Sequence, residues 1–189
     1  MGPRRLPADD YQLRAANGDW LSRHIRDIPD FPQRGVTFKD ITPLLADARA
    51  FEACIDELAA AFTGERVDKV LGIEARGFIV AAPVAVRLGA GFVPVRKPGK
   101  LPWQVRTETY RLEYGTDGLE IHTDALMPGE RALIIDDVLA TGGTASAAAR
   151  LVGSLGGHAV GLGCILELGF LGGRGKLGDL RTVALITYE

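Results

Sequence analysis

The sequence predicts an α/β fold in which a mainly parallel sheet is covered by helices on both faces. Apolar segments with the length of buried strands alternate with segments of helical periodicity along most of the chain. The chain has 189 residues, of which 47% are hydrophobic and 24% are charged. This composition is typical of one globular domain and excludes disordered and fibrous proteins. We therefore expect residues 1–189 to form a single domain.

Five candidate strands account for the sheet. Each is a short, continuous apolar run rather than an alternating one, which indicates burial on both faces. They are residues 67–73, 92–95, 131–138, 158–166 and 182–188.

Helical spacing of apolar residues predicts four helices before and between these strands. Residues 20–28 form the first such pattern, which the following prolines end. Asp47 is expected to cap a second helix that closes at Gly64. Residues 78–88 and an Ala-rich segment after Gly143 predict two more helices.

Two segments differ from this alternation. Residues 31–47 carry prolines and an isolated apolar cluster, which predicts an ordered loop. Within residues 98–122 a polar loop precedes two short strand-like runs, 109–114 and 119–122, which flank a turn at 115–118. We expect residues 98–122 to be a flexible loop and a β-hairpin flap.

Charge, cysteines and apolar run lengths limit the partners. The formal net charge is −2, which does not favour nucleic acid or an anionic membrane as a partner. Cys54 and Cys164 lie far apart in apolar surroundings, so we expect reduced, buried thiols. No signal peptide is recognisable, and the longest apolar stretch falls well short of the ~20 residues that span a bilayer. A cytoplasmic protein is expected.

The end of strand 131–138 carries the strongest functional signal. The strand delivers two adjacent carboxylates, Asp136 and Asp137, to its carboxyl end. Ligands of open α/β sheets bind at that edge. A carboxylate repels phosphate but accepts hydrogen bonds strongly from sugar hydroxyls. The acid pair therefore predicts a site for hydroxyl groups.

A glycine-containing turn follows the acid pair and opens the next helix. It offers free backbone N–H groups, two hydroxyls and the positive end of a helix dipole, a combination that suits a phosphate dianion. Its residues are Ala140, Thr141, Gly142, Gly143 and Thr144. Phosphate beside vicinal hydroxyls indicates a ribose 5-phosphate.

Other nucleotide and hydrolase motifs are absent or misplaced. Neither Gly-Lys pair is followed by Ser or Thr, which excludes a P-loop. A G-x-G-x-x-G match at residues 173–178 precedes a terminal strand rather than a helix, so it does not predict a dinucleotide site. The three histidines share no sequence neighbourhood and no G-x-S-x-G occurs, which leaves a hydrolase triad without support.

The acid pair with its turn resembles the 5-phosphoribosyl 1-pyrophosphate (PRPP) signature of the type I phosphoribosyltransferases. Four other stretches, residues 31–41, 72–78, 95–101 and 110–115, resemble the bacterial adenine phosphoribosyltransferases. The resemblance runs from about Trp20 to the C-terminus and leaves residues 1–19 as a poorly matched N-terminal extension. It implies the type I phosphoribosyltransferase fold, a five-stranded, mainly parallel sheet flanked by helices, with a β-hairpin flap and a small N-terminal hood.

The resemblance also implies an activity. Members of that family transfer ribose 5-phosphate from PRPP to N9 of adenine, which gives AMP and pyrophosphate in purine salvage. They use Mg²⁺ and usually act as homodimers. Phosphoribosyl transfer to another base, such as xanthine, guanine or orotate, and a PRPP-sensing regulatory module are alternative hypotheses.

The chemistry assigns roles to charged residues. Cleavage of PRPP leaves negative charge on pyrophosphate, so cations must gather around the leaving group. Arg76, Arg96, Lys97 and Lys100 supply them, and by resemblance Arg76, Lys97 and Lys100 bind pyrophosphate. Asp136 and Asp137 are expected to hold ribose hydroxyls directly or through the Mg²⁺ shell. No direct metal ligand is expected from the protein, since PRPP carries Mg²⁺ into the site near these two carboxylates.

The flap and the base pocket complete the expected site. Glu113 on the flap is expected to act as a general acid/base or to orient the purine, beside Tyr114, while closure excludes water. Phe38 and Leu139 offer apolar faces between which a purine stacks. The resemblance implies that backbone atoms of Thr37 and Lys39 read adenine. Arg34 and Lys39 stand where the family commonly has Pro and Arg.

Overall fold

The computed structural model describes residues 19–111 and 116–189, and residues 1–18 and 112–115 lie outside the described part. By its internal contacts the chain divides into two compact units, residues 1–57 and 58–189.

The first unit begins with a short helix and a two-stranded ribbon. Helix α2 covers only Asp19–Ser22, and strand β1 (Arg26–Ile28) pairs antiparallel with β2 (Phe38–Asp40). The predicted helix over residues 20–28 is therefore wrong beyond its first turn. Pairing with a segment ten residues further along supplies backbone hydrogen bonds that helical periodicity cannot reveal. The predicted loop 31–47 likewise contains β2.

Carboxylates begin the two helices that follow. Asp40 accepts hydrogen bonds from the backbone N–H and the hydroxyl of Thr42, at 2.9 and 2.8 Å, where α3 (Thr42–Ala46) starts. Asp47 accepts from the backbone N–H groups of Arg49 and Ala50, at 3.0 and 2.9 Å, at the start of α4 (Ala48–Ala61). The predicted cap is confirmed, and the bond from Ala50 lowers the pKa of Asp47.

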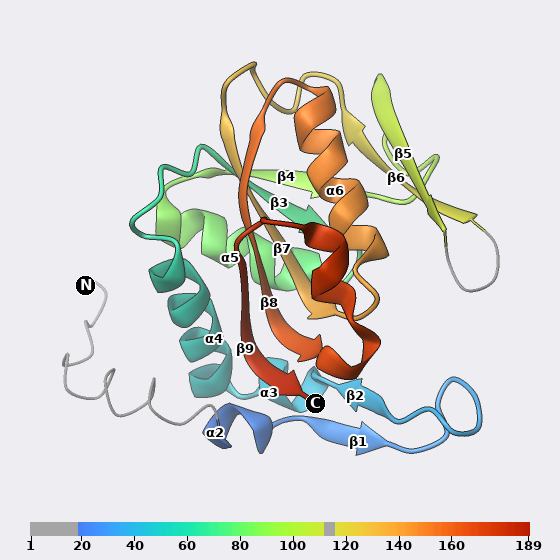
Figure 1. Cartoon of the computed structure of the whole chain (residues 1–189). Helices are drawn as coiled ribbons and strands as arrows, with labels where there is room; N and C mark the ends of the chain where they lie inside the picture. Colours follow the sequence, from blue (N-terminus) through green and yellow to red (C-terminus); the bar gives the residue numbers. More distant parts are fainter. Residues whose placement is uncertain (1–18, 112–115) are drawn as a thin grey trace, which may run out of the picture. The chain divides into compact units, whose positions relative to one another are not determined.

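The second unit is built on a five-stranded sheet (Figure 1). The strands stand in the order β4-β3-β7-β8-β9, and every neighbouring pair is parallel. Their bounds are β3 Lys69–Ile73, β4 Gly91–Val95, β7 Arg131–Leu139, β8 His158–Leu168 and β9 Thr182–Tyr188. All five predicted strands are present, with ends that differ by two residues at most.

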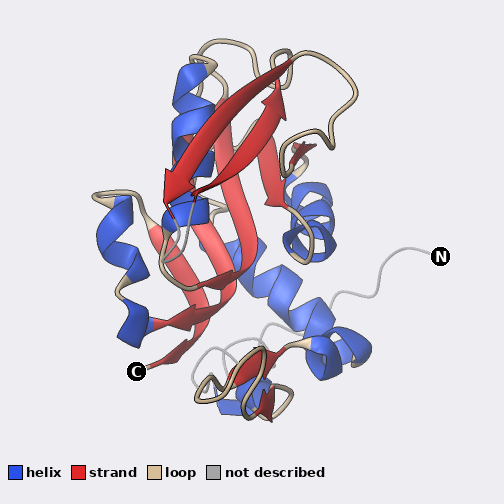
Figure 2. Ribbon diagram, turned by 90° about the vertical axis from the view of Figure 1, so that its right-hand side faces the viewer, coloured by secondary structure: helices blue, strands red, loops and turns tan. Residues whose placement is uncertain are grey.

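Helices lie on opposite faces of this sheet, as Figure 2 shows for α5 (Gly77–Leu88) and α6 (Gly143–Ser154). Helix α5 approaches β3 closely, because a Cβ added to Gly72 would lie 2.8 Å from the Cβ of Ala81. Helix α6 buries Ala147, Ala148 and Leu151 in the main apolar core. Burial on both faces explains why the strands are continuous apolar runs.

An antiparallel hairpin extends from the second unit between β4 and β7. It consists of β5 (Val105–Arg111) and β6 (Thr116–His122). The predicted turn at 115–118 is wrong, because residues 116–118 belong to β6 and pair with residues 109–111. Glycine inside a strand can mark a close approach, and a Cβ on Gly118 would lie 3.1 Å from Cγ of Pro98.

Two 3₁₀ segments, η1 (Gly169–Leu171) and η2 (Gly173–Leu177), connect β8 to β9. No α-helix follows the G-x-G-x-x-G match, in agreement with its rejection as a dinucleotide fingerprint. Cys54 and Cys164 are free and buried, as predicted, and burial raises the pKa of Cys54 to about 12. Among the helices of the described ranges, none has the length and apolarity needed to cross a membrane.

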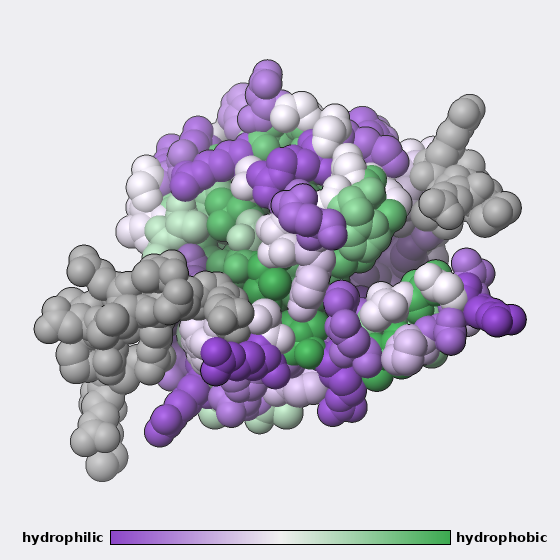
Figure 3. All heavy atoms as spheres, turned by 60° about the horizontal axis from the view of Figure 1, so that its bottom comes forward, coloured by the Kyte–Doolittle hydropathy of each residue, from purple (hydrophilic) through white to green (hydrophobic). Residues whose placement is uncertain are grey.

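The strand order locates the functional edge. The chain passes from β3 to β4 on one side and later returns to β7 on the other side, so β3 and β7 are neighbours at a topological switch point. Strands β7, β8 and β9 run downward in Figure 1. Figure 3, in which the bottom of Figure 1 comes forward, shows hydrophilic side chains interspersed with hydrophobic areas on that face of the molecule.

Candidate active site

The acid pair lies at the carboxyl end of β7, as predicted. Asp137 is buried, with 6% of its surface exposed, and its backbone N–H donates to Asp136 Oδ1 at 2.9 Å. Burial, together with the neighbouring charge of Asp137, raises the pKa of Asp136 well above the ordinary aspartate value. Two carboxylates are thus held together in a poorly solvated place, which a ligand with hydroxyl groups or a cation would stabilise.

Arg76 approaches this pair from the neighbouring strand. It precedes α5 in the connection from β3, and its Nε lies 2.7 Å from Oδ2 of Asp137. This contact is an ion pair without hydrogen-bond alignment, since the buried Oδ2 accepts no hydrogen bond among the described residues. A buried acceptor in this state is uncommon and retains capacity for a donor. A sugar hydroxyl is such a donor.

Helix α5 begins directly against the acid pair. A Cβ added to Gly77 would lie 2.9 Å from Oδ1 of Asp136 and 3.1 Å from the backbone oxygen of Ile135. The peptide bond between Glu74 and Ala75 in the same connection is cis. The contacts that a Cβ on Gly77 would make show that only glycine at the first helical position lets α5 begin so close to Asp136.

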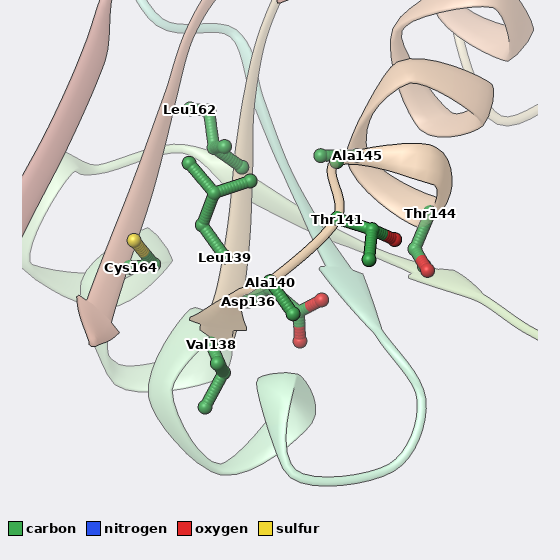
Figure 4. A pocket seen from close by; sticks show the side chains of 10 residues that line it. Asp136, Val138, Leu139, Ala140, Thr141, Thr144, Ala145, Leu162 and Cys164 are labelled. Carbon is green, nitrogen blue, oxygen red and sulfur yellow. The ribbon is translucent and has the colours of Figure 1, made fainter. Parts of the chain in front are cut away.

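The loop after β7 encloses a small cavity of about 70 Å³ (Figure 4). Asp136, Leu139, Thr141 and Thr144 are among its lining residues, and Leu139 is 2% exposed. Gly142 has a φ of +75°, a conformation that glycine adopts without strain, and stands at the N-terminus of α6. Backbone N–H groups and two hydroxyls thus surround the beginning of a twelve-residue helix, as an anion site requires.

Gly173 packs against this loop, and the sequence alone did not indicate that it contributes to the site. A Cβ added to Gly173 would lie 2.0 Å from the backbone oxygen of Ala140, and one added to Gly142 would lie 2.2 Å from that of Gly173. The two backbones are therefore in direct contact. Arg174 fixes this segment by donating to Glu167 of β8 and, at 2.9 Å, to the backbone oxygen of Thr182 in β9.

The loop after β4 carries the basic residues. Because β4 lies next to β3, this loop stands at the same edge of the sheet as Arg76. Lys97 pairs with Asp117 of the hairpin, and Arg96 Nε donates to Glu74 at 2.8 Å. Lys100 is exposed, and its ammonium has no ion pair within the described ranges.

The other predicted site residues belong to the first unit or lie outside the described residues. Thr37, Phe38 and Lys39 belong to the first unit, where Phe38 packs edge-on against Phe31 at 5.3 Å between ring centroids. The Lys39 ammonium donates to Asp27 at 2.8 Å. Glu113 and Tyr114 lie outside the described residues.

Comparison with known proteins identifies the family of this chain. Residues 40–175 match the family model described as the phosphoribosyl transferase domain. The adenine phosphoribosyltransferase of Geobacter metallireducens is 58% identical over 170 residues, which cover 90% of this chain and 99% of the relative. That of Thermobifida fusca is 60% identical over 167 residues, which cover 88% of this chain and 95% of the relative. The chain belongs to the adenine phosphoribosyltransferase family.

Solved structures of adenine phosphoribosyltransferases share the fold. The enzyme from Thermoanaerobacter pseudethanolicus has a TM-score of 0.88 and 52% identity, and the match covers 91% of this chain and all of that one. The enzyme from Saccharomyces cerevisiae, in complex with an imino-altritol bisphosphate and adenine, has a TM-score of 0.85 and 38% identity, with coverages of 90% and 99%. The five-stranded sheet and the hairpin are therefore those of the type I phosphoribosyltransferase fold.

Proposed function

We propose that this chain transfers ribose 5-phosphate from PRPP to N9 of adenine and releases pyrophosphate. One observation carries the assignment of the site: the acid pair, the loop 140–144 and Arg76 meet where β3 and β7 end. The carboxylates of the acid pair can accept hydrogen bonds from the ribose hydroxyls of one PRPP molecule. The loop 140–144 can bind its 5-phosphate, and Arg76 can bind its pyrophosphate.

In the proposed reaction the bond between C1 of the ribose and the pyrophosphate oxygen breaks, and its electron pair leaves with pyrophosphate. The N9 lone pair of adenine forms the new bond to C1, and the base loses a proton. Arg76, Lys97 and Lys100 stabilise the charge that develops on the leaving group. Asp136 and Asp137 hold the ribose hydroxyls, and residues Ala140–Thr144 hold the 5-phosphate.

The base and the flap complete the proposal. Phe38 and Leu139 provide the apolar faces for adenine, and backbone atoms of Thr37 and Lys39 read its edge. Glu113 either acts as a general acid/base, which accepts the proton that adenine loses, or orients the purine, and Tyr114 follows it on the flap. Exclusion of water protects the oxocarbenium-like sugar from hydrolysis.

We also propose that Mg²⁺ enters with PRPP. Two neighbouring carboxylates in a poorly solvated place fit a nearby cation that keeps most of its ligands from phosphate and water, although Oδ2 of Asp137 already pairs with Arg76. Asp136 and Asp137 are the residues that would hold it. When bound, Mg²⁺ supplies charge neutralisation for the pyrophosphate oxygens.

We further propose that residues 1–189 act as a single domain and assemble as a homodimer in the cytoplasm. The family match crosses the boundary between the two compact units. Ile79 and Val86 are seven residues apart and therefore lie on the same face of α5. They are 45% and 79% exposed, and an exposed apolar stripe is typical of an interface. The two free cysteines agree with a reducing compartment. Light scattering of wild type and Val86→Glu tests the dimer.

The activity is tested with purified protein, PRPP and Mg²⁺, with adenine, hypoxanthine, guanine, xanthine and orotate offered separately. AMP formed from adenine alone supports the proposal. A different nucleotide would retain the reaction and contradict the roles of Phe38 and its neighbours. Binding of PRPP without product from any base would favour a regulatory module.

A further inference from the structure

The Lys97 ammonium is held by two side chains of the β5–β6 hairpin. Its Nζ forms an ion pair with Oδ2 of Asp117 in β6 and donates to the Tyr110 hydroxyl of β5 at 3.1 Å. The Tyr110 hydroxyl in turn donates to Oδ2 of Asp117 at 3.1 Å. The three groups therefore form a closed triangle of hydrogen bonds.

The charges of this triangle reinforce one another. Burial by itself would lower the pKa of Lys97, but the hydrogen bonds with Asp117 and Tyr110 outweigh burial and raise it. The hydrogen bond from Lys97 lowers the pKa of Asp117. Lys97 is thus protonated and Asp117 ionised over the pH range in which enzymes ordinarily work.

The backbone that carries Lys97 is also attached to the hairpin. Arg96 and Glu120 exchange backbone hydrogen bonds, at 3.0 Å from Arg96 N and 2.7 Å from Glu120 N. The buried Glu120 side chain accepts from the backbone N–H of Gly99 at 2.9 Å. The basic loop and the base of β6 are consequently one structural element, so the hairpin determines where Lys97 stands.

One member of the triangle, Tyr110, lines a cavity beside the predicted phosphate loop. Tyr110 and Gly143, the first residue of α6, line the same cavity of about 310 Å³, together with Thr109, Ser146, Arg150 and Lys176. An ammonium group has three N–H donors. Asp117 and Tyr110 occupy two of them, which leaves one donor for a ligand at this edge of the sheet.

We propose that Asp117 and Tyr110 are positioning residues for Lys97, which fix its ammonium so that the third N–H meets an oxygen of pyrophosphate. The inference rests on the proposed role of Lys97 in binding pyrophosphate. It assigns a function in the reaction to two hairpin residues that touch no substrate. Pre-organisation of the ammonium reduces the conformational entropy lost on binding.

The sign of the effect separates positioning from a plain charge effect. Asp117 is an anion next to a site for a polyanion, so its removal should strengthen pyrophosphate binding if only long-range charge matters. Loss of positioning should weaken it. Glu108→Ala is the matched control, because Glu108 is an acidic residue of the same hairpin that pairs with Arg150 rather than with Lys97.

Isothermal titration calorimetry of the full chain with magnesium pyrophosphate tests the inference. We expect Asp117→Ala to weaken binding about 5- to 20-fold, and by less than about twofold in a Lys97→Met background, because the effect passes through Lys97. Tyr110→Phe, which keeps the ring, should weaken binding by about threefold and likewise lose its effect in Lys97→Met. Glu108→Ala should leave the affinity unchanged or raise it.

Equal losses in both backgrounds would show a general structural role and overturn the inference, as would tighter binding by Asp117→Ala. If Asp117→Ala does not fold, Tyr110→Phe is compared in the wild-type and Lys97→Met backgrounds instead. Equal losses of affinity in the two backgrounds would again overturn the inference. Wild-type protein that binds pyrophosphate but forms no AMP refutes the proposed function alone. Wild-type protein that forms AMP while its positioning variants bind pyrophosphate normally refutes the inference alone.

Discussion

The backbone of Gly173 lies directly against that of Gly142, so two segments thirty residues apart jointly shape one anion cradle. A Cβ on either glycine would come within about 2.2 Å of a backbone atom of the other segment. Backbone cannot move aside as a flexible side chain can. The shape of the loop 140–144 therefore depends on a residue that itself has no reactive group.

Gly173→Ala is expected to displace this loop. Misplacement of binding groups by about 1 Å costs roughly a hundredfold in rate, so kcat/KM for PRPP should fall by that order. Steady-state kinetics at saturating adenine measures it. Gly175→Ala in the same 3₁₀ segment is the control, because a Cβ there meets nothing within 4 Å. Equal kinetics of the two variants would contradict the supporting role.

Arg174→Met should lower stability by about 1–3 kcal/mol, since it leaves the Glu167 carboxylate without its guanidinium partner. The Glu167 side chain is only 8% exposed. A fall in Tm of roughly 2–10 °C is expected by differential scanning calorimetry. The double variant Arg174→Met/Glu167→Gln should recover part of the loss. No recovery would mean that the packing of Arg174, not the ion pair, is what matters.

Arg76→Ala should lose about 2–4 kcal/mol of transition-state stabilisation, because Arg76 is proposed to meet the charge that develops on pyrophosphate. The measurement is kcat/KM for PRPP. Arg87→Ala provides a comparison, since it removes an exposed arginine from the last turn of α5, the helix that Arg76 precedes. An unchanged rate in Arg76→Ala would reduce Arg76 to a partner of Asp137.

Asp137→Ala should reduce kcat/KM for PRPP by at least about tenfold, because the carboxylate is proposed to accept from ribose hydroxyls. Asp124→Ala, at an exposed carboxylate of the second unit, controls for net charge. Activity of Asp137→Ala within about threefold of wild type would refute the assignment of Asp137 to the ribose.

Asp136 should make the ligand-free protein less stable as pH rises. Its pKa in the folded state is raised above the ordinary value of 3.8, so between these two values the folded state binds more protons than the unfolded state. The free energy of unfolding therefore decreases with pH across that interval. Asp47, Asp68 and Asp117 have lowered pKa values, and their stabilisation is lost below the ordinary aspartate range instead.

Urea denaturation at several values between about pH 4 and pH 7 isolates this contribution as the difference between wild type and Asp136→Asn. The variant should gain stability relative to wild type as pH rises. Parallel pH profiles for the two proteins would show that Asp136 does not titrate above the ordinary range.

The sequence by itself determined the elements whose signals are local. Continuous apolar runs predicted all five strands, because a strand buried on both faces must be apolar at every position. The acid pair and its glycine turn could be identified because strand, carboxylates, turn and helix follow one another within fourteen residues, 131–144. Asp47 was recognised as a cap for the same reason, since its hydrogen bonds reach only three residues ahead.

Only the tertiary structure decided features that depend on residues far apart in the chain. Residues 26–28 pair as a strand because residues 38–40 lie beside them, although their spacing is helical. Gly118 is a strand residue because it pairs with Thr109, and Gly173 is required because Ala140 lies against it. The pairings of Arg76 with Asp137 and of Lys97 with Asp117 arise from the order of strands and from the hairpin. Such contacts depend on which segments the sheet brings together, and no local pattern contains that information.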